Sequence, residues 1–142
     1  MTTLNDLLKD KSSEVFSIQP DQAVYAAMEL MATKEIGALV VLDDGDLVGI
    51  VSERDYARKV ILQGKSSKST HVSDIMTRPV IHVSPTQTVN ECLQIMTQKR
   101  FRHLPVTVGG KVTAVVSIGD LVKAIIAEQQ DIIEQLQHYI TG

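Results

Sequence analysis

The chain of 142 residues has few of the residues that build stacking surfaces or covalent cross-links. It contains no tryptophan, and aromatic residues amount to 4% of it, which disfavours a surface that stacks bases or sugars. Its single cysteine, Cys92, excludes an internal disulfide. Within the segment VNECLQIM we expect Cys92 to be a small buried hydrophobic residue of a helix rather than a catalytic nucleophile.

Excess positive charge and long hydrophobic runs are also absent. The net charge of −3 and the isoelectric point of about 5.7 predict no general attraction to nucleic acid or to anionic membranes. The segments GKSSK and KRFRH leave nucleic-acid binding as a weak alternative. The N-terminal segment MTTLNDLLKDK lacks the apolar core of a secretory signal, and the longest apolar run, IGALVVL, is too short to span a bilayer. We therefore expect a cytoplasmic protein without membrane association.

The sequence does contain an internal repeat. Residues 18–60 align without a gap to residues 83–125, at an offset of 65 positions, and eleven of the 43 aligned pairs are identical. The matching segments GIVSERD (49–55) and AVVSIGD (114–120) each end in Ser, two variable residues and Asp. A gapless match of this length indicates an internal duplication.

Each copy predicts the same order of elements, β-α-β-β-α. The segments EVFSI and PVIHV are expected to be short strands, and apolar residues then recur at helical spacing, from Val24 to Met31 and from Val89 to Met96. Asp-Gly and Gly-Gly turns join the following strand pairs, and a second helix begins after each Ser. We expect an α+β fold in which two pseudo-twofold repeats, residues 1–65 and 66–142, cover each other's sheet faces. The loop LQGKSSKST joins them.

The last helix is predicted to extend beyond its repeat. Leu121, Ile125, Ile132 and Leu136 line one side of it, through the segment IIAEQQDIIEQLQHYI. A helix with apolar residues on more than one face usually has a partner. We interpret it as a contact of a homodimer, with folding back on its own repeat as the alternative.

The repeated Ser-x-x-Asp motif has two interpretations. Ser52 and Ser117 each follow a strand and precede a helix, so each can cap that helix, with the acid three residues on favouring the helix dipole. The same atoms suit a nucleotide. Free N–H groups and the Ser hydroxyl can meet a phosphate, while the two oxygens of Asp55 or Asp120 match the two hydroxyls of a ribose.

Basic residues lie beside both motifs but differ between the copies. Arg102 and His103 run straight into a strand, which favours anion binding over a solvated charge cluster. The first copy has glycine and alanine at those positions, but carries Arg54 where the second has Gly119. We therefore expect two unlike sites, the Arg- and His-rich one being suited to a charged phosphate tail.

Catalysis is not predicted. The four histidines are scattered, no metal-ligand spacing occurs, and no Ser-His-Asp order is supported. The segment DDGD at 43–46 lacks the ligand spacing of a calcium loop and lies in a predicted hairpin. The sequence thus requires no metal.

Two β-α-β-β-α repeats with GIVSERD, RFRHLPV and DIMTRPVIHVSP resemble a tandem pair of cystathionine-β-synthase (CBS) domains, the Bateman module. The chain is similar over nearly its whole length to stand-alone CBS-pair proteins. The resemblance implies an adenosine-containing ligand, such as AMP, ADP, ATP, NAD(H) or S-adenosylmethionine, in clefts between the two repeats. It also implies a homodimer, often a flat disc of four repeats.

The resemblance implies roles for individual residues. Asp55 and Asp120 match the family's ribose-binding acid, and Ser52 and Ser117 match its hydroxyl near the phosphate or ribose. One further segment, Thr77, Arg78, Pro79 and Val80, matches the stretch whose backbone meets the adenine, and Val15 and Phe16 match it more loosely because the spacing differs by three residues. Arg102 and His103 match basic positions that approach phosphate. The chain departs from the family pattern at Ala114, where the motif and the first copy have Gly, so that the alanine methyl group either narrows the second cleft or packs against its neighbours.

The leading hypothesis is a non-catalytic regulatory module that senses energy or redox state through adenine nucleotides and modulates a separate, unidentified protein target. The alternative is an interaction or dimerisation module whose nucleotide clefts are vestigial. In that case the terminal helix and the sheet faces would carry the function.

Overall fold

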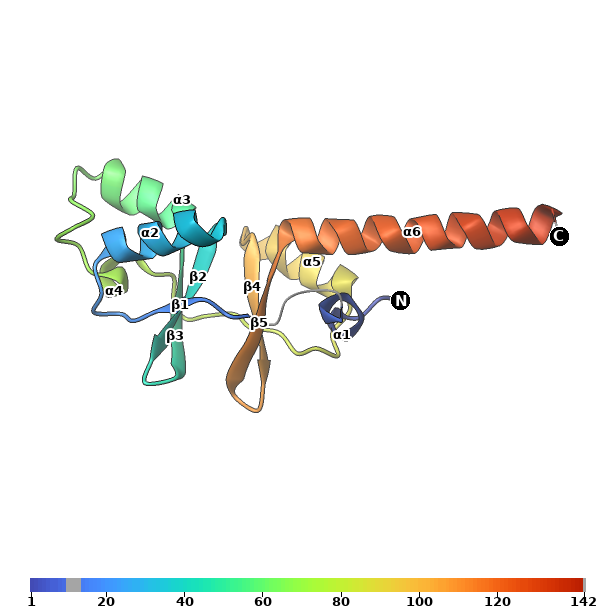
Figure 1. The fold of residues 1–142 in the computed structure, drawn as a ribbon, viewed down its shortest axis with the longest axis horizontal. Helices are drawn as coiled ribbons and strands as arrows, with labels where there is room; N and C mark the ends of the chain where they lie inside the picture. The colour runs from blue at the N-terminus through green and yellow to red at the C-terminus, as the bar shows by residue number, and fades with distance from the viewer. Residues whose placement is uncertain (10–13, 142) are drawn as a thin grey trace. The chain divides into compact units, whose positions relative to one another are not determined.

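The computed structural model describes residues 1–9 and 14–141 (Figure 1). Their contacts divide the chain into two compact units. The repeat-1 unit comprises residues 14–81 and 109–112, and the repeat-2 unit comprises the described residues of 1–13, 82–108 and 113–142. Mixed strands and helices in both units confirm the α+β class.

The repeat-1 unit follows the predicted order of elements. Strand β1 (Ser17–Ile18) is followed by α2 (Val24–Lys34), β2 (Ala38–Asp43), β3 (Asp46–Ser52) and α3 (Glu53–Tyr56). A π-helical turn, η1 (Ala57–Ile61), and the short helix α4 (Val72–Ile75) complete it. The sheet order is β1-β2-β3, with β1 parallel and β3 antiparallel to β2.

The repeat-2 unit contains α1 (Leu4–Leu8), α5 (Val89–Lys99), β4 (His103–Val108), β5 (Lys111–Ser117) and α6 (Ile118–Thr141). Strands β4 and β5 form a two-stranded sheet. Both predicted two-residue hairpin turns are present, with positive φ at Asp44 and Gly45 and at Gly109 and Gly110. These angles are the ones that type I′ turns require.

The first strand of each repeat is shorter than the sequence predicts. EVFSI pairs only at Ser17 and Ile18, and PVIHV pairs only at Val83, through a parallel bridge to Val106. A proline in the neighbouring strand explains why the pairing in repeat 2 is shorter than in repeat 1. Ser17 pairs with Val40, whereas the equivalent partner 65 positions on is Pro105, which has no N–H to donate.

Each repeat is completed by a segment from the other half of the sequence. Leu4 N–H donates to Gln87 O at 2.9 Å, which holds the N-terminal segment against the start of α5. In the same way Val72 N–H donates to Gln22 O at 2.9 Å, before α2. The compact units therefore differ from the expected division into 1–65 and 66–142, because these main-chain bonds assign residues 1–9 to repeat 2 and residues 66–81 to repeat 1.

Each unit has its own apolar core. Cys92 lies in that of repeat 2 with no exposed surface, as its helical spacing predicts. Burial, with a smaller contribution from the Glu91 carboxylate, raises the pKa of its thiol to about 11. The repeat-1 core consists of Ile18, Val24, Ala27, Met31, Leu39, Val41, Val51, Val60, Val72, Ile75 and Met76. Within residues 1–9 and 14–141, no helix is both long and apolar enough to cross a membrane.

Candidate functional site

Both Ser-x-x-Asp motifs lie where a strand passes directly into a helix, and both form a capping box. Ser52 ends β3, and its N–H donates to Asp55 Oδ2 at 3.0 Å, while Asp55 N–H donates back to Ser52 Oγ at 3.2 Å. Ser117 ends β5 and exchanges the same two bonds with Asp120, at 2.8 and 3.1 Å. The capping interpretation is therefore correct for both copies.

Capping uses only one oxygen of Asp55. The second oxygen, Oδ1, lies 3.2 Å from Lys59 Nζ and accepts a 3.4 Å hydrogen bond from Thr77 Oγ1. The Asp55 side chain is 14% exposed and that of Lys59 is 44% exposed, so water reaches the cation more freely than the carboxylate. Both oxygens of the carboxylate thus have donors. On Oδ1, the hydrogen bond from Thr77 is long, and the Lys59 ammonium is accessible to water.

The segment before Pro79 is held against β3. Thr77 N–H donates to Ile50 O at 2.8 Å, and Ile50 N–H donates to Thr77 O at 3.2 Å. Lys59 Nζ also donates to Ile75 O at 2.9 Å, so this one side chain joins η1 to the segment and to Asp55. The structure therefore brings together three of the predicted residues, Ser52, Asp55 and Thr77.

A glycine allows this close approach. A Cβ built on Gly49 would overlap Met76 Sδ and lie 2.8 Å from Met76 Cγ and 3.1 Å from its Cβ. Met76 is buried and directly precedes Thr77. Glycine at position 49 thus leaves room for the Met76 side chain in its present conformation, and Ala114 replaces it in repeat 2.

Within residues 1–9 and 14–141, the structure shows no hydrogen bond or ion pair between the other predicted residues of repeat 1 and the group formed by Ser52, Asp55 and Thr77. Arg54, Arg78 and Pro79 are exposed, and Val15 and Val80 are half-buried. Phe16 packs against the repeat-1 core, and the Lys34 ammonium lies 5.1 Å from the centre of its ring. These positions leave the predicted contacts with adenine as a hypothesis.

In repeat 2, the backbone links the basic segment to the start of α6. Ile118 N–H donates to Arg102 O at 2.8 Å, which places Arg102 and the adjacent His103 beside the Ser117 cap. The Arg102 side chain is exposed, and His103 is half-buried. The equivalent bond in repeat 1 runs from Glu53 N–H to Gly37 O at 3.1 Å, where Gly37 and Ala38 replace Arg102 and His103.

Sequence reasoning missed Lys59 and the role of Gly49. Lys59 follows Asp55 by four residues, and this acid-to-base spacing on a helix is a recognised pairing signal. For Gly49, the family pattern marked the glycine, but its contact with Met76 could not be predicted because Met76 is distant in the sequence.

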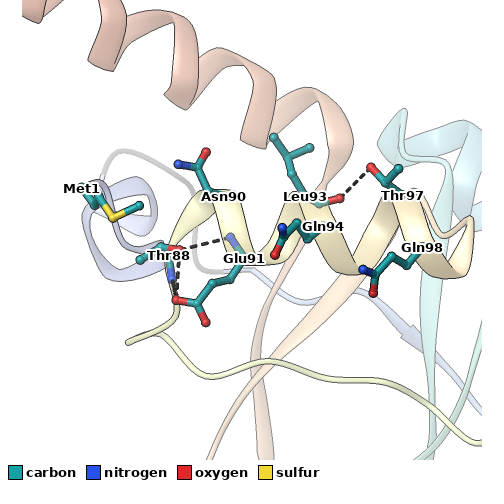
Figure 2. A pocket seen from close by; sticks show the side chains of 8 residues that line it. All are labelled: Met1, Thr88, Asn90, Glu91, Leu93, Gln94, Thr97 and Gln98. Carbon is teal, nitrogen blue, oxygen red and sulfur yellow. Dashed lines mark hydrogen bonds between the residues drawn. The ribbon is translucent and has the colours of Figure 1, made fainter.

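A shallow groove lies elsewhere, on the outer face of α5 (Figure 2). Its volume is about 620 Å³, and its polar lining includes the Thr88–Glu91 capping box. No predicted site residue lines it. The lining residues are Met1, Thr88, Asn90, Glu91, Leu93, Gln94, Thr97 and Gln98.

Comparison with known proteins agrees with the repeats and the fold. CBS domain-containing protein CBSX3, mitochondrial, of Arabidopsis thaliana is 41% identical over 99% of this chain and 73% of its own length. The structure of a protein with CBS domains from Burkholderia ambifaria is 51% identical, with a TM-score of 0.87, covering 90% of this chain and 96% of that one.

A third likeness concerns the fold alone. The CBS domain pair of protein MJ0100, solved in complex with 5′-methylthioadenosine and S-adenosyl-L-methionine, has a TM-score of 0.80 at 23% identity, covering 90% of this chain and 98% of that one. The CBS domain family matches twice, at residues 4–61 and 72–127. The chain thus belongs to the CBS domain family and carries two CBS domains.

Proposed function

We propose that the protein is a non-catalytic regulatory module that binds an adenine nucleotide, AMP, ADP, ATP or NAD(H), at the Ser-x-x-Asp ends of its repeats. It would report energy or redox state to a partner molecule. The observation that carries this proposal is the grouping of Ser52, Asp55 and Thr77, three residues from β3, α3 and the segment after α4. The duplication supplies a second Ser-Asp pair beside Arg102 and His103.

The chemistry of Asp55 supports a ribose contact. A ribose diol offers two O–H donors, and a carboxylate oxygen accepts such donors in place of an ammonium or another hydroxyl. The present donors to Oδ1 are a long bond from Thr77 and a partly exposed ion pair with Lys59. Because the Lys59 side chain is 44% exposed, water can hydrate its ammonium when a ribose hydroxyl takes its place on Asp55.

One solved structure with the same fold is consistent with the ligand class. The two molecules named with the MJ0100 domain pair both contain adenosine, and therefore a ribose diol. Arg102 and His103 favour a ligand with a negatively charged tail in repeat 2, because cations near a site stabilise phosphate. The nucleotide rather than the nucleoside is thus the proposed ligand.

A second candidate function is an interaction module with vestigial sites. It is favoured by the capping boxes, since these give both Ser-Asp pairs a structural role without any ligand. The proposal also includes a homodimer, a separate protein target and a cytoplasmic location. The Arabidopsis relative, by its name, is mitochondrial.

Thermal unfolding with and without ligand tests the proposal. AMP, ADP, ATP, NAD, NADH and S-adenosylmethionine are compared with 2′-deoxy-AMP, which lacks one hydroxyl of the diol. A ligand at about 100 times its Kd adds roughly 2.7 kcal/mol of stability, which shifts Tm by several degrees. We expect a shift with one of the nucleotides and a much smaller one with the deoxy analogue.

Asp55→Asn and Asp120→Asn variants assign the site, and Asp46→Asn, at the exposed start of β3, is the matched control. The ligand-induced shift is measured within each variant, so that loss of a cap does not confuse the comparison. We expect one of the first two variants to lose the shift and the control to retain it. No shift with any ligand would leave the motifs as caps and favour the interaction module.

A further inference from the structure

The C-terminal part of α6 presents apolar side chains to water. The helix has 24 residues, and only Leu121 is buried. Every residue from Gln129 to Ile140 is exposed, and the exposed fractions include 60% at Ile126, 57% at Leu136 and 81% at Ile140. The far end of α6 extends well past α5 in the ribbon (Figure 1).

These apolar residues and Gln129 form a band along the helix, here named the α6 stripe. One row runs from Val122 to Tyr139 with alternating spacings of three and four residues. Beside it, Ile126, Ile133 and Ile140 recur every seven residues. This is a heptad pattern with three apolar positions in seven, a width typical of helices that pack in a bundle or coiled coil. The stripe consists of Val122, Ile125, Ile126, Gln129, Ile132, Ile133, Leu136, Tyr139 and Ile140.

Its own unit leaves this stripe exposed except at Ile125, which is half-buried. An exposed segment of about a dozen residues is marginal as an isolated helix in water, so packing against a partner is what would stabilise it. A membrane surface is a poor partner, because the opposite face carries Asp131 and Glu134 and only one lysine, Lys123, and Glu128 lies beside the stripe itself. Helices that lie on anionic lipid have Lys and Arg on that face instead.

The area of the stripe matches a protein partner. An aliphatic side chain offers roughly 60–120 Å² of apolar surface, so the stripe at its observed exposure offers on the order of 400 Å². A standard interface buries about 800 Å² per partner, of which about 65% is apolar in homodimers, or roughly 500 Å². The stripe alone thus supplies most of the apolar surface that a stable dimer needs.

We propose that α6 pairs with α6 of a second copy of this chain as a parallel, in-register coiled coil in which the two Gln129 side chains face each other. This proposal deepens the proposed homodimer, on which it rests, and is independent of nucleotide binding. Gln129 is the single polar residue of the stripe, and a lone polar residue at such a position fixes register and orientation. In register, the two amides can donate to and accept from each other.

The antiparallel alternative is less favourable. Aligning the same stripes in opposite directions places Gln129 against Ile132 of the second copy and leaves its amide without a partner in an apolar seam. Chemistry and pattern therefore favour one orientation.

Disulfide trapping tests the orientation directly. A Gln129→Cys chain is oxidised mildly, with Gln130→Cys, one residue away on the outer face, as the matched control. The native Cys92 does not interfere, because it is fully buried and its thiol pKa is about 11. We expect disulfide-linked dimers from Gln129→Cys and at least tenfold fewer from the control. Equal yields from both variants would overturn the proposal. So would trapping that requires a mixture of Gln129→Cys and Ile132→Cys chains.

Sedimentation equilibrium tests whether the α6 stripe forms the interface between the two copies. The double variant Ile132→Glu/Leu136→Glu changes only exposed residues, so its body should fold, and Gln130→Glu adds a like charge outside the stripe. We expect the first to halve the mass of the native assembly and the second to leave it unchanged. A monomeric native chain, or an assembly that survives the double variant, overturns the proposal. The nucleotide-induced Tm shift, measured on the same samples, reports separately on the proposed function.

Discussion

The two Ser-x-x-Asp motifs have the same cap and different surroundings. In repeat 1, Asp55 also contacts Lys59 and Thr77, and a glycine beside them admits Met76. In repeat 2, the positions equivalent to Lys59 and Gly49 are Ala124 and Ala114. Duplication has thus preserved the helix cap, which is local, while the groups that reach the carboxylate from elsewhere have changed.

The comparison separates structural from functional demands on one motif. A capping box needs only Ser and an acid three residues later, and both repeats satisfy it. The proposed binding sites would need further groups, and the groups beside the two motifs differ: Lys59 and Thr77 in repeat 1, and the Arg102–His103 segment in repeat 2. The asymmetry in chemistry is what makes two different ligand preferences testable.

Gly49→Ala should have the largest effect on this comparison, because it gives repeat 1 the residue of repeat 2. The new methyl group would overlap the end of the Met76 side chain and lie 3.1 Å from its Cβ, so Met76 must change its side-chain conformation or shift together with the segment that carries Thr77. Overpacking of this kind costs about 1–3 kcal/mol. Urea unfolding measures the loss, and amide exchange at Thr77 and Ile50 reports whether their paired hydrogen bonds open.

Gly119→Ala is the matched control for that change. The nearest atom to a Cβ there is Ser117 Oγ at 3.6 Å, an ordinary contact, and alanine favours the helix. We expect no loss of stability. Met76→Ala combined with Gly49→Ala should cost less than the sum of the two single changes. Strict additivity would show that the two residues do not compete for space.

Lys59→Met should have the second largest effect, since it gives repeat 1 an uncharged residue where repeat 2 has Ala124. It removes the ion pair to Asp55 and the hydrogen bond to Ile75 O while keeping the aliphatic stem. Because Lys59 is partly exposed, we expect a loss of about 1 kcal/mol in urea unfolding, which shrinks at 1 M salt.

Arg58→Met is its control, an exposed cation in the same π-helical turn. It should change the free energy of unfolding by no more than about 0.5 kcal/mol. If both variants lose the same amount, net charge rather than the Asp55–Lys59–Ile75 connection explains the result.

Local sequence signals predicted much of this fold and part of the site. The gapless offset of 65 residues, the Asp-Gly and Gly-Gly turns and the helical spacing around Cys92 are all encoded by neighbours in the chain. The exchange of residues 1–9 and 66–81 between repeats was not predictable in this way, because it depends on main-chain bonds between distant segments. The contact of Met76 with Gly49 could not be predicted either, because these residues are also distant in the sequence.

The site shows the same division. Ser52, Asp55, Ser117 and Asp120 were identified from a repeated local motif, and the resemblance to CBS domains supplied Thr77. The ion pair of Lys59 with Asp55 has a readable spacing, whereas its bond to Ile75 O joins residues 16 positions apart. Contacts of that separation depend on the path of the chain through η1 and the following loop, which composition does not reveal.

The smallest expected effect concerns the first helix of each repeat, where only repeat 2 has a side-chain cap. Thr88 Oγ1 accepts from Glu91 N–H at 3.1 Å at the start of α5, whereas α2 begins at Ala23 with no side-chain bond. Thr88→Ala should therefore cost about 1 kcal/mol, and Ala23→Thr should add up to about 0.5–1 kcal/mol.

Thr97→Ala provides the control on the same helix, because Thr97 is exposed and its hydroxyl only bonds back to Leu93 O. That change should be neutral or stabilising by a few tenths of a kcal/mol, since alanine has the higher helix propensity. Urea unfolding of the three variants decides the matter. If Thr88→Ala costs no more than Thr97→Ala, the capping box of α5 contributes nothing, and the start of that helix is held instead by the main-chain bond from Val89 N–H to Thr2 O, at 2.9 Å.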